Sequence, residues 1–208
     1  TYGGASVTHA GVQAELSSRE RMAVAERARI GAAAAALVEP GAVVMLDAGS
    51  TTAHVARALA ARGVQATVLT NSLTAAAELA AAPGGTIRVL LCPGEVSAGE
   101  RGVYGSEAEA FLRRFNADLA VIGASGLTEE GPSDAVSRAA WVKRAMLDRA
   151  ARRVLVVDSA KFGRALLERV CPLGAVTDLV TEAPPPPGLS AALARAAVAV
   201  TLATGLAK

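Results

Sequence analysis

The sequence contains few aromatic residues and few cysteines. Phe, Trp and Tyr make up 3% of its 208 residues, too few for the stacking platforms that bind single-stranded nucleic acid. The two cysteines, Cys92 and Cys171, lie far apart and lack a CxxC partner, which argues against a disulfide framework or a structural zinc site. His9 and His54 also lack partners at metal-ligand spacing. We therefore expect neither a metal nor a cofactor, and we expect Cys92 to be a small buried residue.

Strong net charge and long hydrophobic runs are also absent. The 21 Lys and Arg residues against 19 Asp and Glu residues give a formal net charge of +2, which leaves no strong electrostatic footprint for a polyanion. No run of about 18 apolar residues without a charge occurs, and no signal peptide is visible at the start. The sequence therefore predicts a soluble, cytoplasmic protein that does not bind a membrane.

Hydrophobic residues are abundant, at 52% of the sequence, and they are arranged in segments of two kinds. Continuous apolar runs typical of strands buried on both faces stand at 42–46, 66–71, 86–92, 117–125, 152–160 and 177–182. Helical patterns stand at 17–38, 51–63, 72–85, 106–115 and 137–150. This alternation predicts an α/β fold with a mostly parallel sheet and helices on both faces.

The two ends of the sequence differ from this pattern. Residues 1–16 show no period and are expected to form an arm or linker, so the predicted α/β domain spans 17–208. The proline run at 184–187 is expected to be a spacer within the domain, because apolar periodicity resumes after it. A short helix near 189–197 and a final edge strand at 198–203 complete the expected order.

Small, hydroxyl and charged residues follow the predicted strands. Ligands bind at the carboxyl ends of the strands in an open parallel sheet, so these residues form the candidate site. They are Asp47, Gly49, Ser50, Thr51 and Thr52 after the first strand, Thr70, Asn71 and Ser72 after the second, Gly94 after the third, Ser125 after the fourth, and Asp158 and Lys161 after the fifth.

The stretch LDAGSTT at 46–52 has the features of a phosphate site. Gly49 lets the backbone approach a ligand closely. Ser50, Thr51 and Thr52 lie where a helix begins, so free N–H groups, the helix dipole and hydroxyl groups are available together. The alternative is that Ser50 or Thr51 caps the helix. The stretch is neither a Walker loop, because the GKS or GKT ending is missing, nor a GxGxxG motif.

Several other polar or aromatic residues have an open or a structural interpretation. Asp158 can accept hydrogen bonds from sugar hydroxyls and Lys161 can supply positive charge, but the two can equally form a surface salt bridge. Lys143 and Arg144 can both lie on a solvated helix face, and we favour this for Arg144. Arg27 is also expected on a solvated face unless its end points into the cleft, and Trp141 is expected to pack against a helix face and not to stack on a ligand.

Six short motifs occur in a particular order. They are GGA at 3–5, LDAGSTT at 46–52, TNS at 70–72, ADLAVIGASG at 117–126, VKRAML at 142–147 and DSAKFG at 158–163. This ordered set, spread over residues 3–182, resembles the effector-sensing domain of the DeoR family of bacterial transcriptional regulators. The resemblance implies a fold related to ribose-5-phosphate isomerase, an effector that is a phosphorylated sugar or related metabolite, and a homo-oligomer.

The resemblance also implies roles for individual residues. One wall of the effector site is formed by Asp47, Gly49, Ser50, Thr51 and Thr52, a second wall by Thr70, Asn71 and Ser72, and polar and charged contacts come from Lys143, Asp158 and Lys161. The sequence departs from the family pattern at Arg27 in place of a lysine, at Pro93 in place of the first residue of a Gly-Gly pair, which leaves only Gly94, and at Ala139 in place of an acid. These changes concern the identity of the effector more than the fold.

The family's winged helix-turn-helix lies before the GGA segment, and only two residues precede GGA here. The resemblance therefore implies that operator DNA is bound only through a domain outside this sequence, and that the effector changes the grip of that domain. Because they are rich in glycine and flanked by apolar strands, the loops at 93–104 and 126–136 are candidates for a lid.

Two enzymatic functions are alternatives to the sensor. A sugar-phosphate isomerase of the same fold needs a base within reach of a carbon-bound proton. The stretch that matches the acidic segment of such isomerases has no acid between Gly123 and Gly126, although Asp47 and Asp158 remain as candidate bases. A CoA-transferase-like enzyme needs a glutamate nucleophile, for which Glu95 is the only candidate at a strand end. We therefore expect a sensor and not an enzyme.

Overall fold

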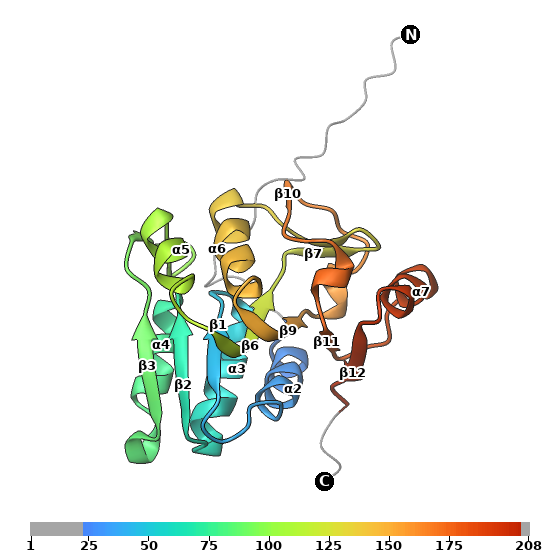
Figure 1. Ribbon diagram of the computed structural model, residues 1–208. Coiled ribbons are helices and arrows are strands. Elements are labelled where there is room, and N and C mark those ends of the chain that lie inside the picture. Colours follow the sequence, from blue (N-terminus) through green and yellow to red (C-terminus); the bar gives the residue numbers. More distant parts are fainter. Residues whose placement is uncertain (1–22, 205–208) are drawn as a thin grey trace.

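The computed structural model describes residues 23–204 (Figure 1). The predicted arm at 1–16, the GGA motif, His9 and the first residues of the helix predicted at 17–38 lie outside this range. No helix within 23–204 is long and apolar enough to cross a membrane.

A seven-stranded sheet forms the centre of the molecule. Its strands are β1 (Val43–Leu46), β2 (Ala66–Thr70), β3 (Ile87–Leu91), β6 (Ala117–Gly123), β9 (Ala150–Val156), β11 (Asp178–Thr181) and β12 (Ala199–Leu202). They lie in the order β12-β11-β9-β6-β1-β2-β3, and all neighbouring pairs are parallel. The predicted parallel α/β architecture and the edge position of the final strand are therefore confirmed.

Helices cover both faces of this sheet. One face carries α2 (Val24–Ala35), α3 (Ser50–Arg62) and α4 (Leu73–Ala80), and the other carries α5 (Ser106–Leu112), α6 (Ser137–Leu147) and α7 (Pro187–Arg195) (Figure 1). The short 3-10 turns η1 (Pro83–Gly85), η2 (Ser159–Lys161) and η3 (Leu173–Ala175) complete the connections. The result is a three-layer molecule with one hydrophobic core on each side of the sheet.

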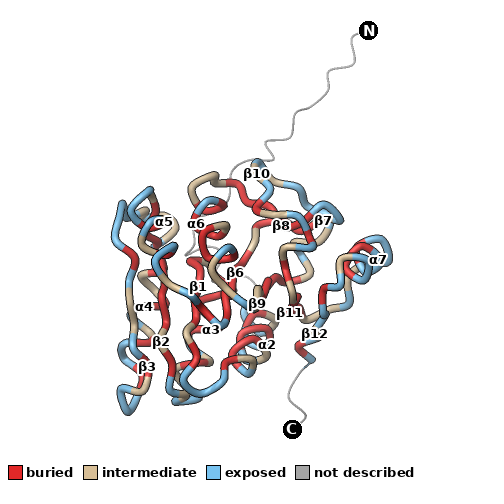
Figure 2. The backbone as a smooth tube through the Cα atoms, in the orientation of Figure 1, coloured by how far each residue is buried: buried red, intermediate tan, exposed pale blue. Residues whose placement is uncertain are grey.

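The continuous apolar runs have a direct structural cause. In β1, Val44 and Leu46 belong to the core beneath α2 and α3, while Met45 between them belongs to the core beneath α5 and α6. Successive side chains of a strand point to opposite faces, so a strand with a core on each side needs apolar residues at every position. Figure 2 shows this as buried strands in the middle of the molecule.

The helix ends follow local backbone chemistry. Gly63 ends α3 in the left-handed region at φ 60°, as expected for a glycine that follows a helix. The helix predicted at 17–38 was expected to end at residue 38, just before Pro40 and Gly41. In the structure α2 already ends at Ala35. The proline run lies between β11 and α7, and Pro187 is the first residue of α7, where its missing N–H costs nothing.

The two predicted lid loops contain strands that the sequence analysis did not predict. Within 93–104, β4 (Glu95–Ser97) and β5 (Gly102–Tyr104) form an antiparallel ribbon. Within 126–136, β7 (Gly126–Thr128) and β8 (Gly131–Asp134) form a small antiparallel sheet with β10 (Glu168–Arg169). These strands are too short and too rich in glycine and polar residues to show a period of two.

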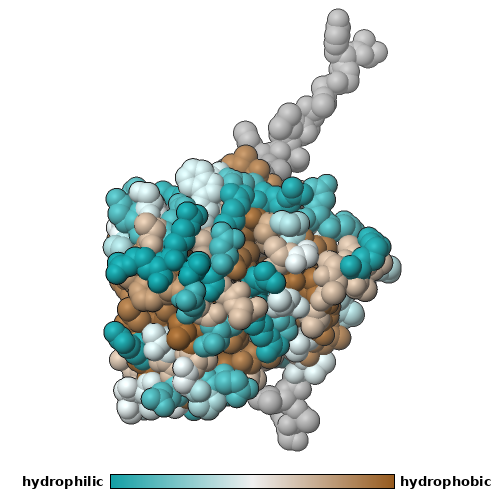
Figure 3. Space-filling model, in the orientation of Figure 1, coloured by the Kyte–Doolittle hydropathy of each residue, from teal (hydrophilic) through white to brown (hydrophobic). Residues whose placement is uncertain are grey.

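One face of the molecule shows apolar side chains at its surface. Figure 3 shows hydrophobic residues gathered below α5 and α6, where strands β1 to β3 run without a helix in front of them. Val43, Leu90 and Phe115 are among the partly buried residues packed against the core on this side.

Candidate functional site

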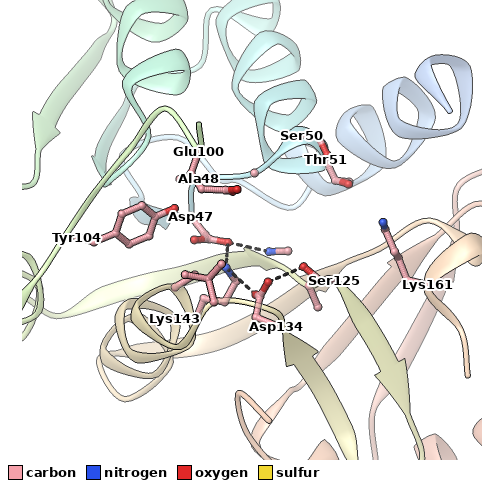
Figure 4. Close-up of a pocket in the computed structure, with 15 residues that line it drawn as sticks. Asp47, Ala48, Ser50, Thr51, Glu100, Tyr104, Ser125, Asp134, Lys143 and Lys161 are labelled. Atoms are coloured by element: carbon pink, nitrogen blue, oxygen red, sulfur yellow. Dashed lines mark hydrogen bonds and ion pairs between the residues drawn. The ribbon is translucent and has the colours of Figure 1, made fainter. Parts of the chain in front are cut away.

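A pocket lies at the carboxyl ends of the two central strands, β1 and β6. β2 and β3 lie on one side of β1, whereas β6, β9, β11 and β12 lie on the other. The order in which the chain adds strands to the sheet therefore reverses between β1 and β6, although the two strands are parallel. In such sheets the crevice outside the carboxyl ends of these two strands binds ligands. Asp47 follows β1 directly, Gly123 ends β6, and both line a pocket at this position (Figure 4).

Half of the predicted site residues line this pocket. They are Asp47, Gly49, Ser50, Thr51, Lys143 and Lys161. Ser125, which follows the fourth predicted strand, lines it too, and so does Ala139. The pocket therefore collects residues from the ends of β1 and β6, the start of α3, the middle of α6 and the turn η2.

A buried cluster of charges forms the floor of the pocket. Lys143 Nζ lies 2.8 Å from Asp47 Oδ2 and 3.1 Å from Asp134 Oδ2, and all three residues are buried. The Ser125 hydroxyl donates to Asp134 Oδ1 at 2.5 Å. The Gly123 backbone N–H donates to Asp47 Oδ2 at 3.2 Å. The cluster thus joins β1, β6, β8 and α6.

The pKa values of this cluster are shifted by burial and by mutual attraction. Burial by itself lowers the pKa of Lys143, but the carboxylates of Asp134 and Asp47 outweigh it and raise the pKa above its ordinary value. Burial raises the pKa of Asp47, and the ammonium of Lys143 opposes that rise. Lys143 is therefore charged at neutral pH, and a single ammonium faces two carboxyl groups.

The start of α3 has no side-chain cap. Gly49 is the N-cap residue, with an extended backbone that any residue adopts, and Ser50 and Thr51 are already helical. Neither hydroxyl therefore occupies the capping position that was the alternative interpretation. Thr52 is buried, and its hydroxyl donates to the Gly49 carbonyl at 3.0 Å. In α4, by contrast, the Ser72 hydroxyl caps the helix by accepting a backbone N–H bond.

Two further predicted residues support the pocket from behind. The Thr70 hydroxyl donates to the Leu46 carbonyl at 2.6 Å. Asn71 accepts a bond from the Ala48 backbone N–H at 2.9 Å and donates to the Val103 carbonyl at 3.2 Å. Asn71 therefore fixes Ala48, which lines the pocket, and it also holds β5 against the end of β2.

Asp158 lies just beyond the carboxyl end of β9, but it is not one of the residues that line the pocket. Its Oδ2 lies 2.9 Å from Arg27 Nε, and both side chains are buried. The expectation of a solvated Arg27 is therefore wrong, because the start of α2 packs over the end of β9. Asp158 is also the residue before η2, the turn that carries Lys161 into the pocket.

The β4–β5 ribbon and β8 bring three residues that sequence reasoning missed, namely Glu100, Tyr104 and Asp134. Arg138 of α6 holds the ribbon in place, since its guanidinium lies 5.3 Å from the Tyr104 ring centroid and donates to the Ser97 hydroxyl at 2.9 Å. No period marks these residues in the sequence. Their positions depend on how short strands fold over the sheet edge.

Gly94 shapes the ribbon and does not line the pocket. Its φ is +133°, which L side chains rarely adopt, and a Cβ there would lie 2.5 Å from the Tyr104 carbonyl oxygen. The glycine is therefore needed for the close approach of the chain to β5.

Three residues outside the pocket also test the sequence expectations. Trp141 is 47% exposed, its indole N–H donates to Glu168 at 3.0 Å, and it is not among the residues that line the pocket. Arg144 is not simply solvated, because it bonds to Glu168 and to the Val170 carbonyl and ties α6 to β10 and its neighbour. Cys92 is buried as predicted, and burial raises the pKa of its thiol to about 12.

The described residues 23–204 contain no group of three or more His, Cys, Asp or Glu side chains that could hold a metal ion. The residues that line the pocket offer hydroxyl groups, backbone N–H groups, carboxyl groups and two lysines.

Comparison with known proteins identifies the family. The family of the DeoR C-terminal sensor domain matches residues 22–183. The chain belongs to the DeoR family. This DeoR domain is 28% identical over 186 residues to the glycerol-3-phosphate regulon repressor of Escherichia coli strain K12, covering 89% of this chain and 73% of that protein. It is 32% identical over 184 residues to the HTH-type transcriptional repressor GlcR of Bacillus subtilis strain 168, covering 88% and 69%.

The fold of the DeoR domain resembles that of ribose-5-phosphate isomerase. Ribose 5-phosphate isomerase A from Neisseria gonorrhoeae matches with a TM-score of 0.50 and 16% sequence identity. The match covers 67% of this chain and 54% of the isomerase. At this identity the likeness concerns the fold, and it agrees with the relationship that the sequence motifs implied.

Proposed function

We propose that this DeoR sensor domain binds a phosphorylated sugar or a related phosphorylated metabolite, and that binding alters how a regulator's helix-turn-helix domain holds operator DNA. The observation that carries the proposal is that the start of α3, with Ser50 and Thr51, lines one pocket together with Lys161 at the switch point of the sheet. The relatives named above are repressors, and one of them is named for a glycerol phosphate regulon.

The proposed phosphate position is the first turn of α3. The N–H groups of a first turn have no partner within the helix, and the positive end of the helix dipole favours an anion by about 0.3–1 kcal/mol. Ser50 and Thr51 add hydroxyl donors, and Lys161 adds charge from η2. Charge-assisted hydrogen bonds of this kind are roughly twice as strong as neutral ones.

Ligand binding then acts as a population shift. A ligand changes the balance between two arrangements of a protein only if it binds one of them more tightly. The β4–β5 ribbon is the proposed moving part, because it brings Glu100 and Tyr104 to the pocket and is held to α6 through Arg138. We expect slower hydrogen exchange in residues 95–104 when ligand is bound. Equal exchange with and without ligand would remove the ribbon from the mechanism.

A binding assay tests the phosphate site. Thermal shift and calorimetry with sugar phosphates, the unphosphorylated sugars and inorganic phosphate compare the parent chain with Thr51→Val and Lys161→Ala. A ligand at one hundred times its Kd adds about 2.7 kcal/mol to the free energy of unfolding. We expect one or more sugar phosphates to stabilise the parent, and each variant to bind about tenfold or more weakly.

Two matched controls accompany this assay. Thr74→Val changes the second residue of α4, the position that Thr51 holds in α3, but in a helix that has a serine cap. Arg113→Ala removes an exposed cation from the residue that follows α5. Both controls are expected to bind like the parent. If no phosphorylated compound binds, or if Thr51→Val binds as tightly as Thr74→Val, the phosphate site is not at α3.

An isomerase remains the second candidate because of one observation. Asp47 Oδ1 is buried in the pocket without a hydrogen-bond partner, and burial raises the pKa of this carboxyl group. A carboxylate in that position suits a general base. Incubation of the chain with sugar phosphates, followed by NMR, distinguishes the candidates. A sensor shows no turnover, whereas turnover that is lost in Asp47→Asn would establish the enzyme.

We also propose that the domain works as a homo-oligomer. Support comes from the apolar side chains gathered below α5 and α6 on the face shown in Figure 3, since contiguous exposed apolar patches commonly mark association surfaces. Light scattering coupled to size exclusion measures the mass in solution. A monomeric mass at micromolar concentration would contradict the proposal.

A further inference from the structure

The two ends of the pocket differ in chemistry. At one end Lys161 lies on the same side as Ser50 and Thr51, while Glu100 and Tyr104 lie at the other end (Figure 4). If the phosphate of the ligand occupies the α3 end, the rest of the ligand extends toward Asp47 and the acidic end. The following inference rests on that proposed phosphate position.

The buried charges on the pocket floor do not balance. Asp47 and Asp134 both contact Lys143, at 2.8 Å and 3.1 Å, so one ammonium serves two carboxyl groups. Lys143 is therefore occupied and is not available to a second anion of the ligand. Glu100 adds a further carboxylate at the same end.

Two carboxyl oxygens of this cluster, Asp47 Oδ1 and Asp134 Oδ2, accept no hydrogen bond within residues 23–204. Asp134 Oδ2 has an ion-pair contact with Lys143 Nζ at 3.1 Å, so of the two oxygens Asp47 Oδ1 is the one left with neither kind of contact there. Asp47 is fully buried, and its Oδ2 takes bonds from Lys143 and from the Gly123 N–H. Asp47 Oδ1 accepts no hydrogen bond from any residue in the range that the structure describes, and in Figure 4 no dashed line reaches it. Buried polar atoms without a partner are rare and costly. Asp47 is one of the residues that line the pocket, where a ligand can supply the missing donor.

We propose that Asp47 Oδ1 accepts a hydrogen bond from the end of the ligand opposite its phosphate, and that the pocket selects monophosphates with a donor group at that end over compounds with a second anion there. The donor is a hydroxyl or an ammonium group. A phosphate or carboxylate in its place would meet Asp47, Asp134 and Glu100 at short range, and like charges juxtaposed in a binding site strongly disfavour binding.

The substitution Asp47→Asn gives an inverted specificity. The Lys143 ammonium is donor only, so it orients the new amide with its oxygen toward Nζ and its NH₂ group toward the position of Oδ1. The variant therefore presents a donor where the parent presents an acceptor, and it removes one negative charge. A ligand with a second anion should therefore bind Asp47→Asn more tightly than the parent, because it finds a hydrogen-bond donor and meets one negative charge fewer. A ligand with a hydroxyl group at that end should bind more weakly, because the acceptor for its hydroxyl is gone.

The test compares matched ligand pairs by calorimetry. The pairs are fructose 6-phosphate with fructose 1,6-bisphosphate, glucose 6-phosphate with 6-phosphogluconate, and glucosamine 6-phosphate as the ammonium arm. In the parent we expect each monophosphate with a neutral or cationic far end to bind at least about tenfold more tightly than its doubly anionic partner. In Asp47→Asn we expect that ratio to fall by about tenfold or to reverse. A comparison of glucosamine 6-phosphate with glucose 6-phosphate shows whether an ammonium or a hydroxyl group is the preferred donor.

A second variant keeps the test valid if Asp47→Asn does not fold. Glu100→Gln changes a half-buried residue in the turn between β4 and β5, and it should raise the affinity for the doubly anionic compounds more than the affinity for the monophosphates, so that the ratio between them falls. Glu107→Gln, an exposed residue of α5, is the matched control and should change neither.

The outcomes separate this inference from the proposed function. If both members of each pair bind the parent equally, and Asp47→Asn and Glu100→Gln leave the ratio unchanged, the inference is wrong and the phosphate site stands. If no phosphorylated compound binds the parent or the variants, the inference falls together with the proposed function.

Discussion

Lys143 is the cation in the buried charge cluster on the pocket floor, and it contacts both carboxyl groups. Its side chain is buried between Asp47 and Asp134, so the ammonium compensates two buried carboxyl groups. Removal of one member of a buried ion pair typically costs about 3–5 kcal/mol, because the remaining charge has no partner. We expect Lys143→Met to lower the free energy of unfolding by about that amount, measured by urea denaturation.

The control for this experiment is Arg113→Ala, which removes an exposed cation paired with Glu109. Exposed pairs contribute about 0–1 kcal/mol. A loss in Lys143→Met no larger than that in Arg113→Ala would show that the pocket cluster contributes little to stability.

Asp178 gives a prediction for acid stability. Two hydrogen bonds from Arg152, at 3.0 Å and 2.7 Å, hold the pKa of Asp178 below its ordinary value of 3.8. A lowered pKa in the folded state contributes stability that is present above the ordinary pKa and is lost as the pH falls through the folded value. Thermal unfolding from about pH 6 down to about pH 2 should therefore show a steeper loss of stability below the ordinary pKa in the parent than in Asp178→Asn. Parallel curves would contradict this assignment.

Individual site residues differed in how far the sequence predicted them. Asp47, Ser50 and Thr51 were found because they follow a buried strand directly, and the strand-end rule needs only the order of elements. Asp134 was missed because its strand has no recognisable period. Arg27 was assigned to solvent because a helical pattern shows which residues share a face but not what covers that face.

At the scale of elements, the contact between α2 and α3 is unusually close. A Cβ on Gly31 would lie 2.6 Å from the His54 backbone carbon and 2.7 Å from its oxygen, so only glycine fits there. Alanine is favoured over glycine inside a helix by about 1 kcal/mol, but overpacking costs about 1–3 kcal/mol. Because backbone atoms cannot move aside as a flexible side chain can, we expect Gly31→Ala to be a net loss in stability.

The matched control is Gly174→Ala in η3, where a new Cβ would have no neighbour within 4 Å. Chemical denaturation of both variants measures the difference. A Gly31→Ala protein as stable as the control would show that α2 and α3 can separate without cost.

The elements themselves were predicted to different degrees. Strands with a core on both faces and helices of two or more turns carry their own pattern in the sequence, so their order was predicted correctly. The short strands β4, β5, β7, β8 and β10 were not predicted. They depend on close backbone approaches at residues such as Gly94 and Gly131, which only the folded chain reveals.

At the scale of the whole molecule, the site depends on contacts between distant parts of the chain. Asp47 lies at the end of β1, Gly123 at the end of β6, and Lys143 in α6, and the three meet only because β6 pairs with β1 on the side opposite β2. The pocket therefore belongs to the complete sheet and not to a local motif. This arrangement explains why the strand-end residues could be predicted as a set while their partners could not.

The same arrangement fixes when the site comes into being during synthesis. Chains grow at roughly 5–20 residues per second, so Lys143 is added roughly 5–20 s after Asp47. Until then β1 and β2 can pair, but the Asp47 carboxylate lacks the ammonium group that compensates its charge in the folded protein. Formation of the Asp47–Lys143 contact is thus a late step, and in a nascent chain that has made only β1 to β3 the pocket is incomplete.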